Sequence, residues 1–243
     1  FPFPSAYGYD DYGSYNCAGP QMFVHDDVKS AIPFMKKSKE GRKPFFINLW
    51  IHEPHTPFHV DPKLQKLFPD LEEADNIYAA TLYHADLRIG QLLDALEEMK
   101  ITENTLVIFS SDNGPARGAP NSPITLTYDS ATGPGYGIGG ARGITGGRRA
   151  FKGALMEGGI GVPFIARWPG KIAAGKVDKT SVLSAVDLLP TFCELAGVKL
   201  PKSYKPDGIS QVSTLMGRGN KLRKKPIFWK MSAPWPANES KPD

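Results

Sequence analysis

The segment Thr-Leu-Val-Ile-Phe-Ser-Ser-Asp-Asn-Gly, residues 105–114, is the stretch that decides the fold. Its apolar, β-branched first part predicts a buried strand over 105–111. That strand runs directly into Asp112, Asn113 and a glycine. Hard oxygen donors at the carboxyl end of a buried strand are typical of a metal or anion site in an α/β sheet. Taken alone, the same three residues would also suit a surface turn.

Strands and helices are predicted to alternate on both sides of this segment. Apolar runs predict further strands over 45–51 and 162–168. A long helix is predicted over about 75–99, between the first strand and the central one. Its apolar residues fall on one stripe: Ala85, Ile89, Leu92, Leu96 and Met99. A strand, a helix and a strand in succession predict a βαβ unit with a right-handed crossover, so the expected fold class is α/β.

Two shorter helices are predicted near the ends of the chain. Asp26 and Asp27 suit the first turn of a helix over about 26–38, because apolar residues follow them at helical spacing. A second helix is expected over about 187–196, with Ser184 or Asp187 as its cap and Gly197 at its end.

Histidines and prolines follow the strand predicted over 45–51. The sequence of residues 52–59 is His-Glu-Pro-His-Thr-Pro-Phe-His. Histidine suits proton transfer or hydrogen bonding near neutral pH. The three histidines, at 52, 55 and 59, also invite a zinc hypothesis. The two prolines between them would interrupt the helix that this spacing needs, and no cysteine lies near.

Four motifs, in their order along the chain, resemble the sulfatase family of the alkaline-phosphatase superfamily. They are Pro-His-x-Pro at 54–57, Ser-Asp-Asn-Gly-Pro at 111–115, Lys-x4-Glu-Gly-Gly at 152–159 and Arg-Trp-Pro-Gly-Lys at 167–171. The resemblance covers nearly the whole chain. It implies part of an alkaline-phosphatase-like sheet with helices on both faces.

The resemblance also implies roles for four residues. Asp112 and Asn113 match metal ligands, for Ca²⁺ or alternatively Mg²⁺, and Lys152 matches a lysine that contacts the sulfate. His55 matches a histidine beside the sulfate and the leaving group. Ca²⁺ takes about 6–8 oxygen ligands, so two residues cannot complete its site. In similar sulfatases two N-terminal aspartates complete it. An ordinary surface lysine is the alternative for Lys152, and His84, inside the long helix, is more typical of a structural histidine.

The nucleophile expected in this family has no counterpart here. The family carries a Cys-x-Pro-x-Arg signature whose cysteine, or serine, becomes formylglycine, and neither Cys17 nor Cys193 lies in such a motif. Asp10 and Asp11 are poor candidates for the missing metal pair, because the prolines before them oppose a central strand. We therefore expect a segment of an arylsulfatase-like sulfuric ester hydrolase, inactive alone, whose formylglycine lies in a missing N-terminal part.

Two other functions stay open: a phosphatase or phosphonate hydrolase of the same superfamily, and a non-catalytic binding domain with the sulfatase fold. The expected substrate is a sulfated small molecule or carbohydrate. The family resemblance favours a periplasmic, secreted or lysosomal location.

Composition is that of a globular protein, with 41% hydrophobic and 22% charged residues and a net charge of +4. No apolar run approaches the roughly 18 residues of a membrane span, so no membrane partner is expected. One basic cluster, residues 221–225, predicts a solvated loop, and another spans 142–152. Neither has the interleaved aromatic residues typical of nucleic-acid binding, so no nucleic-acid partner is expected.

The domain organisation follows from loop-like stretches. Eight of the fifteen residues over 133–147 are glycine, which predicts a long loop that either shapes the substrate entrance or is disordered. Residues 1–201 are expected to form part of the catalytic α/β domain. Residues 202–243 would be a linker and the truncated start of a C-terminal subdomain, with a strand beginning at Ile227.

Overall fold

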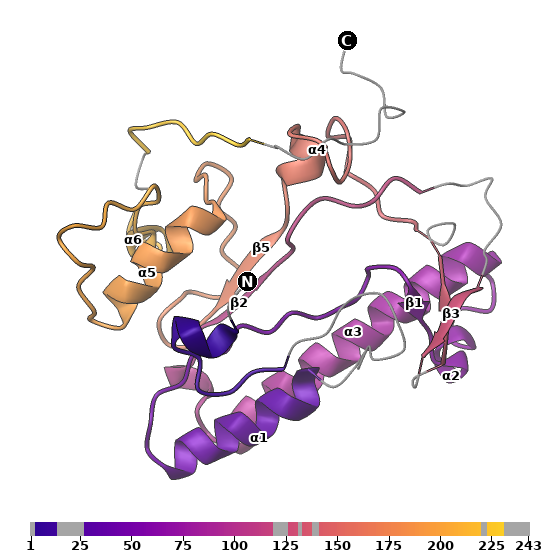
Figure 1. Cartoon of the computed structure of the whole chain (residues 1–243), viewed down its shortest axis with the longest axis horizontal. Coiled ribbons are helices and arrows are strands. Elements are labelled where there is room, and N and C mark those ends of the chain that lie inside the picture. Colours follow the sequence, from indigo (N-terminus) through magenta and orange to yellow (C-terminus); the bar gives the residue numbers. More distant parts are fainter. Residues whose placement is uncertain are drawn as a thin grey trace. The chain divides into compact units, whose positions relative to one another are not determined.

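The computed structural model describes residues 3–13, 27–118, 126–130, 133–137, 141–219 and 223–230 (Figure 1). The chain divides into two compact units. The first comprises Phe1–Met99 and Gly114–Gly159, and the second Lys100–Asn113 and Ile160–Asp243. Asn113 and Gly114 are neighbours in the sequence but belong to different units.

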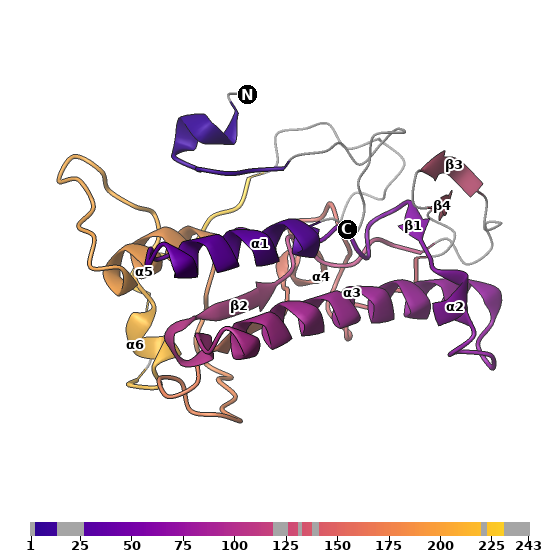
Figure 2. The ribbon, with the colours of Figure 1, turned by 90° about the horizontal axis from the view of Figure 1, so that it is seen from below.

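Two helices, α1 (Asp27–Glu40) and α3 (Glu73–Glu98), lie side by side in the first unit (Figure 2). The carboxylate of Asp27 accepts a hydrogen bond from the amide of Val28 at 2.7 Å, which satisfies a donor in the first turn. The helix buries Val28, Ala31 and Met35. The helix predicted over 26–38 is confirmed, although Asp26 lies outside the described residues.

Helix α3 confirms the long helix predicted over 75–99. Its buried residues are Ala74, Ile77, Ala80, Thr81, Ala85, Arg88, Ala95 and Leu96. Ile89 and Leu92 are only half-buried, whereas Arg88, which was not among the predicted stripe residues, is buried. His84 is half-buried in the same helix.

The first unit also contains a small antiparallel sheet with strand order β1–β4–β3. Its strands are β1 (Phe58–His59), β3 (Leu126–Ser130) and β4 (Gly133–Tyr136), and the short helices η1 (Pro4–Tyr7) and α2 (Pro62–Gln65) complete the unit. The prediction of a continuous loop over 133–147 is wrong at β4. In β4, Gly135 pairs with His59, and a Cβ on Gly135 would lie 2.6 Å from the Cβ of Pro57. Glycine therefore permits this strand to approach β1.

The core of the first unit gathers where β1 meets α3. The buried side chains of this cluster are Phe58, Val60, Ile77, Ala80 and Ala141. The rings of Phe58 and Tyr78 pack edge to face, with centroids 5.8 Å apart. The carboxyl-terminal end of the histidine-rich segment, at β1, is thereby packed against α3.

The strand predicted over 45–51 is not formed among the described residues. Burial does alternate there, because Phe46 and Trp50 are exposed while their neighbours are half-buried. A strand also needs hydrogen bonds to a partner, and none of the described strands pairs with this segment. The sequence pattern indicates the pleat of a strand but cannot supply the partner.

The second unit contains β2 (Val107–Ser110) and β5 (Phe164–Arg167). They confirm the strands predicted over 105–111 and 162–168, with shorter bounds. They pair antiparallel, with Val107 opposite Arg167 and Ser110 opposite Phe164. The predicted βαβ unit is not formed among the described residues, because its first strand, expected over 45–51, is not formed. The expectation that the central strand is buried is also wrong, because β2 is half-buried in its first half and exposed in its second.

A hydrogen-bonded anchor around Asp187 organises the rest of the second unit. The helices there are η2 (Thr102–Asn104), η4 (Ala185–Asp187), α5 (Leu188–Leu195) and α6 (Val212–Leu215). Ser184 and Asp187 form a capping box, and Gly197, at φ +68°, ends the predicted helix. Asp187 also accepts a hydrogen bond from the amide of Ile209 at 2.8 Å and pairs with Arg223. Arg223 is therefore not part of a fully solvated loop, as the basic cluster had suggested.

Residues 226–230 have no regular structure, so the strand predicted at Ile227 is not formed. The domain boundary predicted after residue 201 stays a prediction. No helix in the described part of the chain has the length and apolar character needed to cross a membrane.

Candidate functional site

The His52–His59 segment folds into a tight turn that leads into β1. The amide of His55 donates to the carbonyl of His52 at 2.9 Å, and the Nε2 atom of His52 lies 3.2 Å from the carbonyl oxygen of Pro57. The ring of His52 lies 5.7 Å from that of His55 and 6.1 Å from that of His59, centroid to centroid. His52 and His59 are 7% and 2% exposed, so both rings are buried within this turn.

His55 is the exposed histidine of this turn. Its Nδ1 atom lies 2.5 Å from the carbonyl oxygen of Thr56. Because a carbonyl oxygen can only accept, Nδ1 must carry the proton in this contact. The neutral ring then has its lone pair on Nε2, which is the atom left to receive a proton or to donate one once protonated.

A buried ion pair ties the turn to α3. Arg88 is 4% exposed, and its Nη1 atom lies 3.5 Å from Oε1 of Glu53, whose side chain is 1% exposed. Arg88 also pairs with Asp27 at the start of α1. Arg88 was not among the functional residues predicted from the sequence. The available signal was the position of Arg88, three residues after Ala85, which places it on the same face of the helix as the apolar stripe.

Backbone packing between glycines joins the Asp-Asn-Gly-Pro and Lys-x4-Glu-Gly-Gly motifs. The amide of Gly114 donates to the carbonyl of Gly159 at 2.8 Å, and that of Gly158 to the carbonyl of Arg149 at 2.7 Å. A Cβ on Gly114 would lie 1.8 Å from the oxygen of Gly158, and a Cβ on Gly158 would lie 2.0 Å from the oxygen of Ala150. We call Gly114, Gly158 and Gly159 the glycine junction. It explains in steric terms why both motifs carry glycine.

Lys152 is placed by the same packing. It is half-buried and lies in a turn before the short helix α4 (Glu157–Ile160). Its amide donates to the carbonyl of Pro115 at 2.8 Å. The backbone of Lys152 is therefore held against the residue that follows the Asp-Asn-Gly motif.

Asp112 and Asn113 follow β2 in the second unit. Asp112 is exposed and Asn113 half-buried, and the Oδ1 atom of Asp112 accepts from the amide of Asn113 at 2.9 Å. Ser111 donates through its hydroxyl to the carbonyl of Asn113 at 3.0 Å. His55 and Lys152 belong to the first unit, so the roles that the resemblance implies for the four residues stay predictions.

The chemistry of Asp112 and Asn113 fits a hard cation such as Ca²⁺ or Mg²⁺, since both offer side-chain oxygens. Two side chains supply only part of such a site. In the described ranges, no group of three or more His, Cys, Asp or Glu residues is arranged to hold a metal ion. A complete site requires further ligands.

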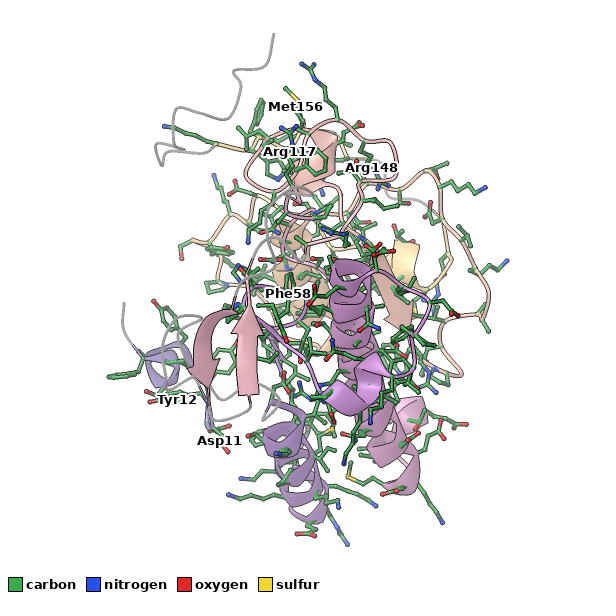
Figure 3. All side chains as sticks on the ribbon, turned by 90° about the vertical axis from the view of Figure 1, so that its right-hand side faces the viewer. Asp11, Tyr12, Phe58, Arg117, Arg148 and Met156 are labelled. Atoms are coloured by element: carbon green, nitrogen blue, oxygen red, sulfur yellow. The ribbon has the colours of Figure 1, made fainter. Side chains whose placement is uncertain are left out.

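Several arginines occur in the segments that precede Lys152 in the sequence. Arg117 and Arg148 are exposed, and Figure 3 shows both on irregular loops in the upper part of the view, where Met156 also lies. The hydroxyl of Thr145 donates to the carbonyl of Arg148 at 2.8 Å, which holds that turn. Arg142 instead pairs with Asp75 at 2.8 Å, so its charge is neutralised.

The family model described as Sulfatase matches residues 1–198. The chain belongs to the sulfatase family. It is 31% identical over 191 residues to arylsulfatase G of Rattus norvegicus, covering 79% of this chain and 33% of the relative. It is 30% identical over 205 residues to N-acetylgalactosamine-6-sulfatase of Canis lupus familiaris, covering 83% and 34%. This sulfatase chain thus spans about a third of the length of the curated relatives it matches.

Solved structures show the same partial sulfatase fold. Ps i-CgsB, solved in complex with k-i-k-neocarrahexaose, superposes with a TM-score of 0.65 at 30% identity, covering 79% of this chain and 38% of that one. The PsFucS1 sulfatase from Pseudoalteromonas sp. gives a TM-score of 0.62 at 28% identity, covering 81% and 35%. The expected alkaline-phosphatase-like fold is thereby confirmed in part, at the level of the family.

Proposed function

We propose that this chain supplies one side of the active site of an enzyme that hydrolyses sulfate monoesters. Asp112 and Asn113 would be metal ligands, Lys152 would bind the sulfate, and His55 would serve the leaving group. The observation that carries the proposal is the glycine junction with its hydrogen bond from Lys152 to Pro115. It holds the lysine backbone against Pro115, which directly follows the Asp-Asn-Gly motif in the sequence, and this contact supports the proposal.

The ammonium of Lys152 suits a tetrahedral anion, since it is a compact charge with three donors on a flexible stem. Facing a sulfate oxygen, it would stabilise negative charge that grows in the transition state. His55, with the Nδ1 proton engaged by Thr56, would act through Nε2. In its doubly protonated form it would give the Nε2 proton to the alcohol oxygen as the ester bond breaks, and the ring would be left neutral. A bound Ca²⁺ or Mg²⁺ would supply charge neutralisation for sulfate oxygens. The nucleophile, a formylglycine, would come from sequence outside this chain.

The substrate class that we propose is a sulfated carbohydrate. One relative is named N-acetylgalactosamine-6-sulfatase, and one similar structure holds k-i-k-neocarrahexaose. The exposed guanidinium groups of Arg117 and Arg148 are suited to further anionic groups on such a chain, because planar guanidinium matches oxyanion geometry.

The test is a hydrolysis assay on the intact protein with an aryl sulfate, a sulfated oligosaccharide and an aryl phosphate. We expect turnover of both sulfates, with a higher kcat/KM for the carbohydrate. Faster hydrolysis of the phosphate would favour the phosphatase alternative. Binding without turnover of any ester would instead support a non-catalytic domain.

The 243-residue chain alone is expected to release no sulfate and to bind calcium weakly or not at all. It lacks the nucleophile, and two side-chain donors fall short of the roughly 6–8 oxygens that Ca²⁺ takes. Isothermal calorimetry with Ca²⁺ and an aryl sulfatase assay measure both properties. Sub-micromolar calcium binding or robust turnover by this chain would contradict the assignment.

Asn113→Ala should cost the intact protein both calcium affinity and rate. Asn104→Ala is the matched control, because Asn104 is an exposed asparagine of the same unit that lies before β2. We expect calcium to raise the melting temperature of wild type and of the control, and to raise that of Asn113→Ala clearly less. Equal calcium-dependent shifts in all three proteins would remove Asn113 from the metal site.

A further inference from the structure

Arg88 stands out because the other buried residues of α3 are uncharged. It contacts two carboxylates, Glu53 at 3.5 Å and Asp27, and all three side chains are less than a tenth exposed. Burying a charge is costly unless it is paired with good geometry. A buried ion pair is therefore weak evidence for a gain in stability. The presence of Arg88 is better explained by the segment that it holds in place.

Glu53 lies two positions before His55, at the start of the turn. The other end of the turn is fixed by Phe58, which packs in the core with Ile77 and Ala80 of α3. Arg88 is eleven residues after Ile77, which corresponds to roughly 16 Å along a helix. The turn is thus fastened to one rigid helix at two separated points, and exposed His55 lies between them in sequence.

We propose that Arg88 is a positioning residue, which through Glu53 holds the His52–His59 turn so that His55 is presented in one orientation. This inference rests on the proposed function of His55. The reason for an ion pair at this point is directional. The guanidinium fork reaches Glu53 through Nη1 and Asp27 through Nη2, so its rigid plane sets the place of one carboxylate relative to the other. An apolar contact would let the start of the turn slide along the helix.

The experiment compares Glu53→Gln, Asp27→Asn and Arg88→Lys with wild type in the intact protein. The two carboxylate variants are a matched pair, because each removes one negative charge from Arg88 and preserves side-chain shape. Only Glu53 belongs to the turn that carries His55. We expect Glu53→Gln to lower kcat by about 10–100-fold with KM changed less than about threefold, as for a misplaced catalytic group.

Arg88→Lys should act in the same direction as Glu53→Gln, since it keeps the charge but loses the fork. Asp27→Asn should leave kcat within about twofold of wild type, as for a group that acts on stability alone. Equal losses of kcat in the two carboxylate variants, or a wild-type kcat in Glu53→Gln, would overturn the proposal.

Ring NMR signals of the histidines, measured on the same proteins, give a readout that needs no turnover. Glu53→Gln and Arg88→Lys should shift or broaden the His55 signal, while Asp27→Asn should not. Unchanged His55 signals in Glu53→Gln would reject positioning even if the enzyme is active. A wild-type protein without sulfatase activity would reject the proposed function, and the NMR comparison would still decide the role of Arg88.

Discussion

Lys152→Ala is expected to lower kcat of the intact protein by about 10²–10³, the usual cost of losing one preorganised donor to a transition-state charge. Stability should change by no more than about 0.5 kcal/mol, as for most substitutions outside a core. The structural reason is that Lys152 is held through its backbone amide, which bonds to Pro115 and remains in the variant. Steady-state kinetics and thermal melting measure the two effects separately.

Lys66→Ala is the matched control for this variant, because Lys66 is an exposed lysine of the same unit at the end of α2. It should leave both kcat and the melting temperature at wild-type values. An unchanged kcat in Lys152→Ala would return that residue to an ordinary surface lysine. A large fall in melting temperature would make it a structural residue instead.

Gly158→Ala is expected to destabilise the first unit by about 2–4 kcal/mol, through overpacking and disturbed hydrogen bonding. The new methyl group would lie 2.0 Å from the oxygen of Ala150 and 2.5 Å from that of Arg149. Both are backbone atoms, so relief requires the loop before Lys152 to move. The hydrogen bond from Gly158 to Arg149 is strained by the same movement. Chemical denaturation of the 243-residue chain measures the loss.

Gly90→Ala serves as the comparison, because a Cβ at Gly90, inside α3, would meet no atom within 4 Å. Alanine should stabilise the helix there by about 0.5–1 kcal/mol, through helix propensity. If Gly158→Ala were as stable as wild type, the close packing of the glycine junction would be refuted.

The helices were the most predictable part of the fold. The spacing of Val28 and Met35 indicated α1, and that of Ala85, Leu96 and Met99 indicated α3, because one buried face imposes a helical period on nearby residues. The capping box at Ser184 and Asp187 is also local in sequence. Such signals can be read from a few consecutive residues.

Strand pairing was less predictable, because the partner of a strand is distant in sequence. Nothing in residues 107–110 or 164–167 indicates that the two strands run antiparallel. The glycines of β4 predict a loop when only the sequence is considered. Their role is to let one backbone approach another, and that role depends on a partner that is distant in sequence. The pattern over 45–51 carries strand alternation without a pairing partner among the described strands.

The same holds for the candidate site: its local motifs could be predicted, and its long-range contacts could not. Motif spacing and family resemblance singled out His55, Asp112, Asn113 and Lys152. Arg88 could not be singled out from the sequence, because its role depends on the contact with Glu53, which is distant along the chain. The burial of His52 and His59 could not be predicted either, because it depends on how the turn packs.

The most direct measurement is a crystal structure of the intact protein with Ca²⁺ and a bound sulfate. The proposed site predicts Asp112 and Asn113 on the metal, with Lys152 Nζ and His55 Nε2 within roughly 3.5 Å of sulfate oxygens, the reach of a hydrogen bond. A separation of more than roughly 15 Å between Lys152 or His55 and Asp112, in an ordered structure, would contradict it, since one sulfate cannot contact groups so far apart.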